Sequence, residues 1–167
     1  MAALTVRKYG DPVLRRKADP VREITPEVRK MIADMIDTMY DEVGIGLAAT
    51  QVGIPLRLMV VGDEDGRSAR ALVNPVITRQ GGEVTAEEGC LSIPGVFAPV
   101  ARAEWVELEA QDLEGRPVSI RARGLTARVF QHEMDHLDGV VFIDRLRGIK
   151  RDLIVRKIHK LKKTGKW

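Results

Sequence analysis

The sequence QHEMDH at residues 131–136 is the stretch on which the rest of this chain depends. On an α-helix, His132 and His136 stand one turn apart on the same face, so both imidazoles can ligate one metal ion. Glu133 then projects from a neighbouring angle towards a water on that metal, where a carboxylate can act as a base. The motif therefore favours a metal hydrolase over a helix with two unrelated surface histidines. It leaves the third ligand to be found elsewhere.

Cys90 is the candidate for that third ligand, because it is the only cysteine in the chain. A lone cysteine forms no internal disulfide and fits a reducing, cytoplasmic setting. It lies in the segment Glu87–Gly95, where a preceding glycine and a following proline turn can present a thiol from a strand edge into a cleft. The alternative is a buried, inert cysteine.

A second notable segment, Gly44–Gln51, is rich in small residues. Its two glycines allow the backbone to approach another group closely, and Ala48 and Ala49 leave room for something bulky alongside. Gln51 ends the segment with a neutral side chain that carries both a donor and an acceptor. The alternative is a tight turn that leads into a buried strand.

The overall composition is that of a globular protein of one domain, which we expect to span residues 1–167. Hydrophobic residues make up 44% and aromatic residues only 4%, so aliphatic side chains must fill most of the core. No apolar run approaches the length of a membrane span, and the first residues form no apolar signal region. Membrane and disulfide-rich classes are thereby disfavoured.

The charge is distributed unevenly along the chain. Residues 145–167 hold ten Lys and Arg residues against one acid, Asp152, which gives this tail a net charge of +9. The total is +3, so the remainder is acidic. A basic tail behind an acidic body suggests attraction to a polyanion, although most such runs are solvated helix faces.

Apolar periodicity predicts the secondary structure. We expect an extended surface segment over the first twenty residues, and then a helix that is capped by Thr25 and ended by Gly44. Further helices are expected over Leu125–Leu137 and beyond Gly148, the last with an apolar stripe. Strands are expected at Leu58–Val61, Ala71–Val76, Val84–Ala86 and Val140–Ile143, with an antiparallel hairpin formed by Trp105–Asp112 and Val118–Ala122.

Three separated segments together resemble one family. The runs Gly44–Gln51, Glu88–Ser92 and His132–His136 match, in order, the motifs of peptide deformylase, a metallohydrolase that removes the formyl group from the N-terminal methionine of new bacterial proteins. The resemblance extends over nearly the whole chain. It implies an α+β fold, in which antiparallel sheets are packed around a central metal-binding helix, with a further helix at the C-terminus.

The resemblance also implies the metal site. Its ligands are Cys90, His132 and His136, and the fourth position is left for water, as in catalytic rather than structural metal sites. A cysteine and two histidines accept Zn²⁺, Ni²⁺, Co²⁺ or Fe²⁺, and only the family points to Fe²⁺ in vivo.

The same resemblance assigns the catalytic groups. Glu133 accepts the proton of the attacking water, while the Gln51 side-chain amide and the Leu91 backbone N–H stabilise the oxyanion.

Substrate-binding positions follow from the resemblance as well. The peptide is expected to add as a strand against Ile45–Gly46 on one side and Gly89 on the other. An apolar pocket for methionine is expected beside the metal helix, with Ile45, Leu125 and Val129 as its walls. Arg128 is expected at the rim of that pocket, with its guanidinium in water. Arg102 is expected near the substrate path, or else as a surface arginine.

Nascent N-formylmethionyl polypeptides are the expected partners, with a ribosome contact through the basic C-terminal helix and with neither DNA nor a membrane as partner. Two alternatives remain open at this point. One is a zinc peptidase with a distant third ligand, and the other is a metal-stabilised RNA-binding or ribosome-associated protein. The first leaves Cys90 and Gln51 unexplained, and the second needs a fourth protein ligand that the sequence does not offer.

Overall fold

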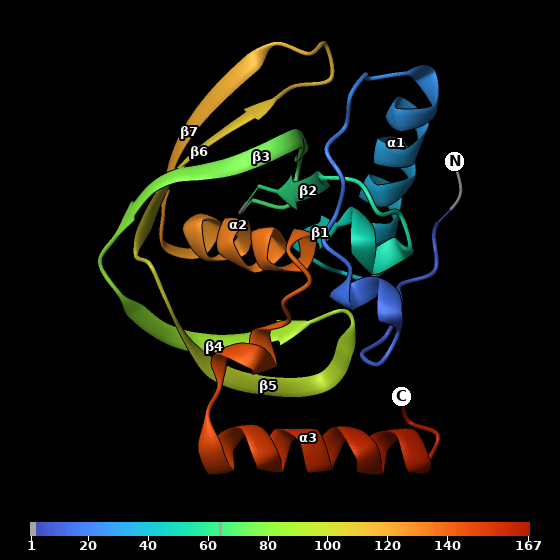
Figure 1. Cartoon of the computed structure of the whole chain (residues 1–167), viewed down its shortest axis with the longest axis vertical. Coiled ribbons are helices and arrows are strands. Elements are labelled where there is room, and N and C mark those ends of the chain that lie inside the picture. The colour runs from blue at the N-terminus through green and yellow to red at the C-terminus, as the bar shows by residue number, and fades with distance from the viewer. Residues whose placement is uncertain (1–2, 64) are drawn as a thin grey trace.

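Two antiparallel sheets lie on either side of helix α2 in the computed structural model, which describes residues 3–63 and 65–167 (Figure 1). This confirms the predicted α+β fold around a central helix. The predicted absence of an apolar signal region concerns, among others, Met1 and Ala2, which lie outside the described residues. The helices are α1 (Pro26–Asp41), α2 (Gly124–Leu137) and α3 (Gly148–Lys163), and the 3-10 turns are η1 (Pro12–Arg15), η2 (Ala49–Val52) and η3 (Phe142–Arg145).

The larger sheet has the strand order β1-β2-β3-β6-β7, and the smaller one pairs β4 with β5. All the strand pairs are antiparallel, and β3 pairs with β6 although the smaller sheet lies between them in the sequence. The predicted hairpin is confirmed as β6 paired with β7, and the predicted strands before it are longer in the structure. The strands are β1 (Gly46–Ala48), β2 (Leu58–Gly62), β3 (Ala69–Gly81), β4 (Val84–Cys90), β5 (Ile93–Arg102), β6 (Trp105–Gln111) and β7 (Pro117–Arg123).

Helix α2 is buried on both of its faces. Ala127, Phe130 and Leu137 on one face join the core formed with the larger sheet. The opposite face carries His132 and His136 towards β4 and β5, and both histidines are buried. A helix that is buried on two opposite faces is held by its neighbours in one orientation, which is what a metal site requires.

Helix α1 covers the β1–β2 end of the larger sheet (Figure 1). Its start is as predicted, because Thr25 Oγ1 accepts the N–H of Val28 and Pro26 occupies the first turn. Its end differs from the prediction. The helix stops at Asp41, and Val43 rather than Gly44 takes the left-handed conformation, with φ = 55°.

The chain after α2 departs from the prediction of a strand over Val140–Ile143. This segment leads into η3 instead, because the Asp144 carboxylate accepts the Val141 N–H and the Asp144 N–H bonds back to the Val141 carbonyl. Those local bonds replace a strand partner. Phe142 and Ile143 are nevertheless buried, in a third core formed with the smaller sheet.

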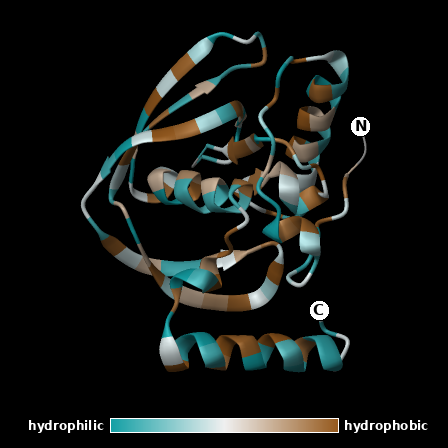
Figure 2. Cartoon of the chain, in the orientation of Figure 1, coloured by the Kyte–Doolittle hydropathy of each residue, from teal (hydrophilic) through white to brown (hydrophobic). Residues whose placement is uncertain are grey.

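Helix α3 lies along the outside of that smaller sheet and shows alternating hydrophilic and hydrophobic bands (Figure 2). The predicted apolar stripe is packed only in part. Ile158 is buried, and Ile154 and Leu161 pack on the third core. Ile149 and Leu153 remain exposed, at 75% and 56%, because helical periodicity places them on the side of α3 opposite the buried Ile158.

The first twenty residues are more deeply embedded than the predicted surface segment. Val6, Leu14 and Ala18 are each buried, and the segment forms the turn η1 beside η2. We predicted an extended surface segment because of its charged residues, but the apolar residues between them face the core. Among the described residues, no helix is long and apolar enough to cross a membrane.

Gly139 provides a test of the packing between this N-terminal segment and the end of α2. Its φ is +78°, and a Cβ at this position would lie 2.5 Å from the carbonyl oxygen of Arg15. We expect Gly139→Ala to lower the free energy of unfolding by about 2 to 4 kcal/mol, since the left-handed strain adds to a backbone clash. Urea denaturation measures the loss.

Gly66→Ala is the matched control for that change. Gly66 also has a positive φ, +71°, but nothing lies within 4 Å of its added Cβ. This variant should lose only about 1 kcal/mol from the backbone strain. Equal losses in the two variants would contradict the assigned clash.

Candidate active site

The three predicted ligand residues converge at one point. One ligand atom from each of Cys90, His132 and His136 lies within 4.8 Å of the others, and these residues form the one such cluster among residues 3–63 and 65–167. His136 Nε2 is 3.2 Å from His132 Nε2 and 3.3 Å from Cys90 Sγ. Ligands about 2.1 to 2.3 Å from a tetrahedral ion stand about 3.4 to 3.6 Å apart, so the residues fit a small divalent cation.

Two different elements supply these ligands. The histidines come from consecutive turns of α2, whereas Cys90 ends β4 at an irregularity where the pairing with β5 shifts register. The Ser92 N–H points back to Cys90 Sγ at 3.4 Å. This contact helps to hold the Cys90 side chain in place at the end of β4.

Glu133 lies beside this cluster and is buried, and its Oε1 has no hydrogen-bond partner among the described residues. Burial raises the pKa of Glu133 to about 7, although the neighbouring His132 and Arg102 act in the opposite direction. Gly46 makes this placement possible, since a Cβ there would lie 2.8 Å from Glu133 Oε2 and 2.7 Å from Val129 Cγ1. The carboxylate therefore has an oxygen available for a ligand in the cavity.

The Gln51 amide has a fixed orientation. Its Oε1 accepts the Ala48 N–H at 2.9 Å, and only the oxygen of an amide can do so. The NH₂ group consequently faces the site, 3.2 Å from Ser92 Oγ and 3.6 Å from Cys90 Sγ. Gln51 is thus a hydrogen-bond donor beside the metal ligands, as an oxyanion-binding group must be.

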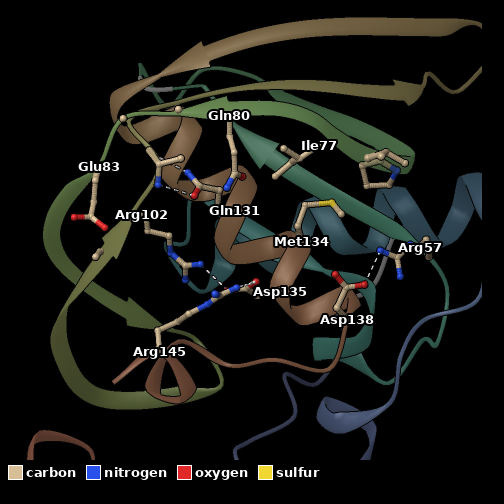
Figure 3. Close-up of a pocket in the computed structure, with 16 residues that line it drawn as sticks. Arg57, Ile77, Gln80, Glu83, Arg102, Gln131, Met134, Asp135, Asp138 and Arg145 are labelled. Atoms are coloured by element: carbon tan, nitrogen blue, oxygen red, sulfur yellow. Dashed lines mark hydrogen bonds and ion pairs between the residues drawn. The ribbon is translucent and has the colours of Figure 1, made fainter. Parts of the chain in front are cut away.

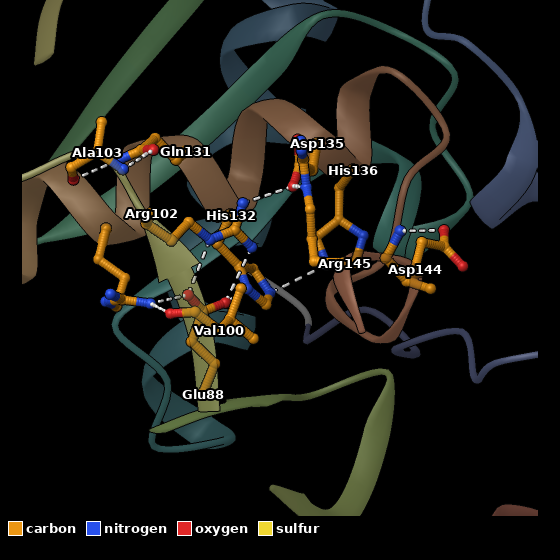
Figure 4. Close-up of polar contacts among 12 residues, drawn as sticks. Glu88, Val100, Arg102, Ala103, Gln131, His132, Asp135, His136, Asp144 and Arg145 are labelled. Atoms are coloured by element: carbon orange, nitrogen blue, oxygen red, sulfur yellow. Dashed lines mark hydrogen bonds and ion pairs between the residues drawn. The ribbon is translucent and has the colours of Figure 1, made fainter. Parts of the chain in front are cut away.

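Glu88 contacts helix α2 from the side that carries the histidines (Figure 4). Its buried carboxylate lies 3.0 Å from His132 Nδ1 and accepts bonds from Arg102 at 2.8 and 2.9 Å and from Arg128. Burial raises the pKa of Glu88, but the bonds to His132 and Arg102 outweigh it and lower the pKa to about 2. Because the ionised Glu88 carboxylate pairs with His132 Nδ1, the other ring nitrogen, Nε2, is free to face Cys90 and His136.

The two histidines respond differently to this environment. Burial lowers the pKa of His132, but the neighbouring Cys90 and Glu88 groups raise it well above the ordinary value. Burial and the adjacent His132 lower the pKa of His136 well below that value. A neutral imidazole offers a lone pair to a metal ion, so the lowered pKa of His136 suits a ligand.

Comparison with known proteins agrees with this geometry. A model of the polypeptide deformylase family matches residues 3–152. The chain belongs to the peptide deformylase family. The peptide deformylase of Alkalilimnicola ehrlichii is 47% identical over 99% of this chain and 94% of its own length, and that of Thermodesulfovibrio yellowstonii is 47% identical over 98% and 100%. The expectation of one domain over residues 1–167 stays a prediction.

Solved structures agree as well. A peptide deformylase from Legionella pneumophila superposes with a TM-score of 0.92 at 42% identity, covering 98% of this chain and 97% of its own. The Synechococcus elongatus peptide deformylase, determined in complex with actinonin, gives 0.87 at 45% identity over 97% and 86%. Members of the family are metal-dependent hydrolases that remove the N-formyl group from nascent peptides.

A cavity of about 560 Å³ opens beside the metal cluster. All five residues of the predicted peptide groove and methionine pocket line it, and they are Ile45, Gly46, Gly89, Leu125 and Val129. Leu91 lines it too, at the turn between β4 and β5. The structure thus brings these residues together with the metal ligands, and their roles towards a substrate stay predictions.

Arg102 requires a correction. Its side chain is buried and its guanidinium bonds to Glu88 and Asp135, so it is neither a surface arginine nor part of the cavity beside the metal. It lines a second cavity of about 720 Å³ behind α2, together with Asp135 and Arg145 (Figure 3). A guanidinium held by two carboxylates neutralises Glu88, and a role of Arg102 towards a substrate stays a prediction.

Arg128 requires a correction of the same kind. It lines the metal-bearing cavity, as predicted, but its guanidinium is not in water. It bonds to Glu88 and to the carbonyl oxygens of Val84 and Val100, at 2.6 and 2.9 Å. The buried Glu88 carboxylate draws the arginine inward, because an unpaired charge there is unfavourable.

Sequence reasoning missed Glu88 and Asp135, although both carried a signal. Glu88 stands two residues before Cys90 on a strand, and residues with that spacing share a face. Its carboxylate therefore points to the same side as the thiol, towards α2. Asp135 stands three residues after His132 on the helix, where it reaches Arg102 and Arg145.

The position of Glu88 predicts its effect on metal binding. We expect Glu88→Gln to weaken metal affinity about 10- to 100-fold, because the amide removes the negative charge that orients His132. Competition with a chromophoric chelator measures the affinity. Glu87→Gln is the control, since Glu87 is exposed and precedes Glu88 on the same strand. Equal affinities in these two variants would rule out a supporting role for Glu88.

Proposed function

We propose that Cys90, His132 and His136 bind the metal with which this chain removes the formyl group from N-formylmethionyl peptides. The proposal is supported most directly by the convergence of the three ligand atoms beside Glu133 Oε1, which has no hydrogen-bond partner within residues 3–63 and 65–167. A structural metal would need a closed set of four ligands, and the cluster within the described residues has three.

In the proposed mechanism, Glu133 moves the proton. A bound divalent cation supplies Lewis-acid chemistry, which acidifies water and polarises the formyl carbonyl. Glu133 Oε1 accepts a proton from the attacking water as the new C–O bond forms. It then delivers that proton to the methionine nitrogen as the C–N bond breaks, which releases formate and a free amine.

Two donors stabilise the negative charge that develops on the formyl oxygen. The Gln51 NH₂ group already faces the site because Ala48 holds the amide oxygen. We assign the Leu91 backbone N–H as the second donor, at the turn that follows Cys90. Donors that are fixed before the reaction need no reorganisation in the transition state.

Peptide binding uses the edges of β1 and β4 in this proposal. The substrate adds as a strand between Ile45–Gly46 and Gly89, where the absence of side chains on both glycines lets backbones approach. The methionine side chain enters the apolar part of the cavity, against Leu125 and Val129. We place the reaction in the cytoplasm, where Cys90 stays reduced.

We propose Fe²⁺ as the metal in vivo. The ligand set also accepts Zn²⁺, Ni²⁺ and Co²⁺, so the family resemblance, rather than the geometry, favours iron.

We propose further that α3 contacts ribosomal RNA. Ile149, Leu153, Arg156 and Lys160 recur at helical spacing and are all exposed, which gives the helix an outward face of mixed apolar and basic character. A net charge of +9 over residues 145–167 favours association with a polyanion. The helix would then bring the site close to emerging chains.

The role of Glu133 is tested by Glu133→Gln. The amide preserves the shape of the side chain but accepts no proton, so formate release from formyl-Met-Ala-Ser should fall at least ~10²-fold. Metal content, measured on the same sample, should be retained. Turnover close to that of the unmodified protein with metal bound would remove Glu133 from the mechanism.

The metal is tested by exposure to oxygen. With Fe²⁺ bound, activity should decay faster in air than under argon, because the ion and the Cys90 thiolate are both oxidisable. The Zn²⁺-substituted protein is the control and should decay at similar rates in both atmospheres. If the protein purified without oxygen lost activity with the same half-life in air and under argon, this would argue against iron.

The ribosome contact is tested by neutralising three exposed lysines of α3, Lys157, Lys160 and Lys163, to glutamine. Ribosome cosedimentation should weaken, and the slope of log K against log salt should become about 2 units shallower. The control neutralises three exposed arginines of the larger sheet and its turn, Arg116, Arg121 and Arg123. Equal binding by the α3 variant and the unmodified protein at low salt would refute the contact.

A further inference from the structure

Two large apolar side chains at the mouth of the metal-bearing cavity are exposed to solvent. Val43 is 90% exposed and Phe97 is 61% exposed, and both line that cavity. They come from different parts of the chain, the end of α1 and the middle of β5. Large apolar groups that gather at the opening of a binding cavity indicate a contact with a ligand.

The backbone at Val43 is strained. Its φ of 55° lies in the left-handed region, which a β-branched residue rarely adopts. Glycine would end α1 here without strain, and it occupies the next position, Gly44. Strained backbone persists where the surrounding structure over-determines it, and it gathers at ligand-binding sites. At this position the strain holds an isopropyl group at the cavity mouth.

Phe97 is placed by its pairing with Gly89. The two residues are register partners in the smaller sheet, and a Cβ on Gly89 would lie 2.6 Å from Phe97 Cε1. The aromatic ring therefore covers the glycine. Side chains directly opposite each other in paired strands lie on the same face. A peptide strand that pairs with Gly89 consequently places one of its own side chains on the face that carries the Phe97 ring.

The charges around this mouth disfavour acidic ligands. Glu42 and Glu87 line it and are exposed, whereas the one lysine of the lining, Lys8, donates to the Val6 carbonyl oxygen. An acidic side chain brought here would meet like charge.

We propose that Val43 and Phe97 form an apolar rim at the cavity mouth that discriminates between substrates. The rim contacts the side chain of one substrate residue downstream of formyl-methionine, the residue whose backbone pairs with Gly89. The inference rests on the proposed function. The substrates it favours are formyl-methionyl peptides with a bulky apolar residue, such as leucine or phenylalanine, at the second or third position. Alanine at that position binds less well, and aspartate binds least.

Two peptide series test the rim, formyl-Met-X-Ser and formyl-Met-Ala-X, with X as alanine, leucine, phenylalanine or aspartate. The measured quantity is the ratio of kcat/KM for phenylalanine to that for alanine. We expect a ratio of about 10 in one series for the unmodified protein, since one large side chain gains a partly buried contact. Phe97→Ala should reduce this ratio to about 1 to 2, and Val43→Gly should reduce it in part.

Phe97→Leu and Val76→Ala are the controls. Phe97→Leu keeps an apolar group over Gly89 and should retain most of the preference. Val76 is 55% exposed, but it lines the cavity behind α2, so Val76→Ala should leave the ratio unchanged. A kcat/KM ratio near 1 in both series would overturn the proposed rim, and so would a ratio that neither Phe97→Ala nor Val43→Gly changes. In both cases, release of formate would still uphold the proposed function. No formate release from any peptide overturns both.

Discussion

The buried carboxylate of Glu88 is the constraint on which the site depends. A charge removed from water is unfavourable unless it is fully paired, and here His132, Arg102 and Arg128 surround it. Such pairing adds little net stability, but each of its members must hold its place. The pairing therefore fixes β4, which carries Cys90, against α2, which carries the histidines. The arrangement of Cys90, His132 and His136 follows from an electrostatic requirement rather than from shape alone.

A second constraint is steric. Helix α2 approaches β1 so closely that Gly46 has room for no side chain, since a Cβ there would overlap Val129 and Glu133. The same closeness places Glu133 out of water and raises its pKa. One small residue thus permits the close packing of α2 on β1 and, with it, the buried position of Glu133.

Residues whose role is local could be predicted from the sequence. The spacing of His132 and His136, the cap at Thr25 and the alternation of the β6–β7 hairpin each depend on neighbours along the chain, and each is confirmed. Arg102 and Arg128 were misplaced because their partner Glu88 lies 14 and 40 residues away. Arginine side chains are usually exposed. These two are buried because each pairs with a buried acid, and the sequence does not reveal that this acid is buried.

The C-terminal helix is tied to the active site more directly than its charge suggests. Lys162 donates to the Tyr9 carbonyl oxygen and lies over the rings of Tyr9 and Trp167. The Tyr9 N–H in turn donates to the carbonyl oxygen of Ser92, whose hydroxyl contacts the Gln51 amide. Removal of the tail would release this chain of contacts and disturb the Gln51 amide, the proposed oxyanion donor. Surface substitutions on α3 that leave Lys162 in place therefore test the attraction of the helix to a polyanion without disturbing its contacts to the site. Truncation of the helix changes both at once.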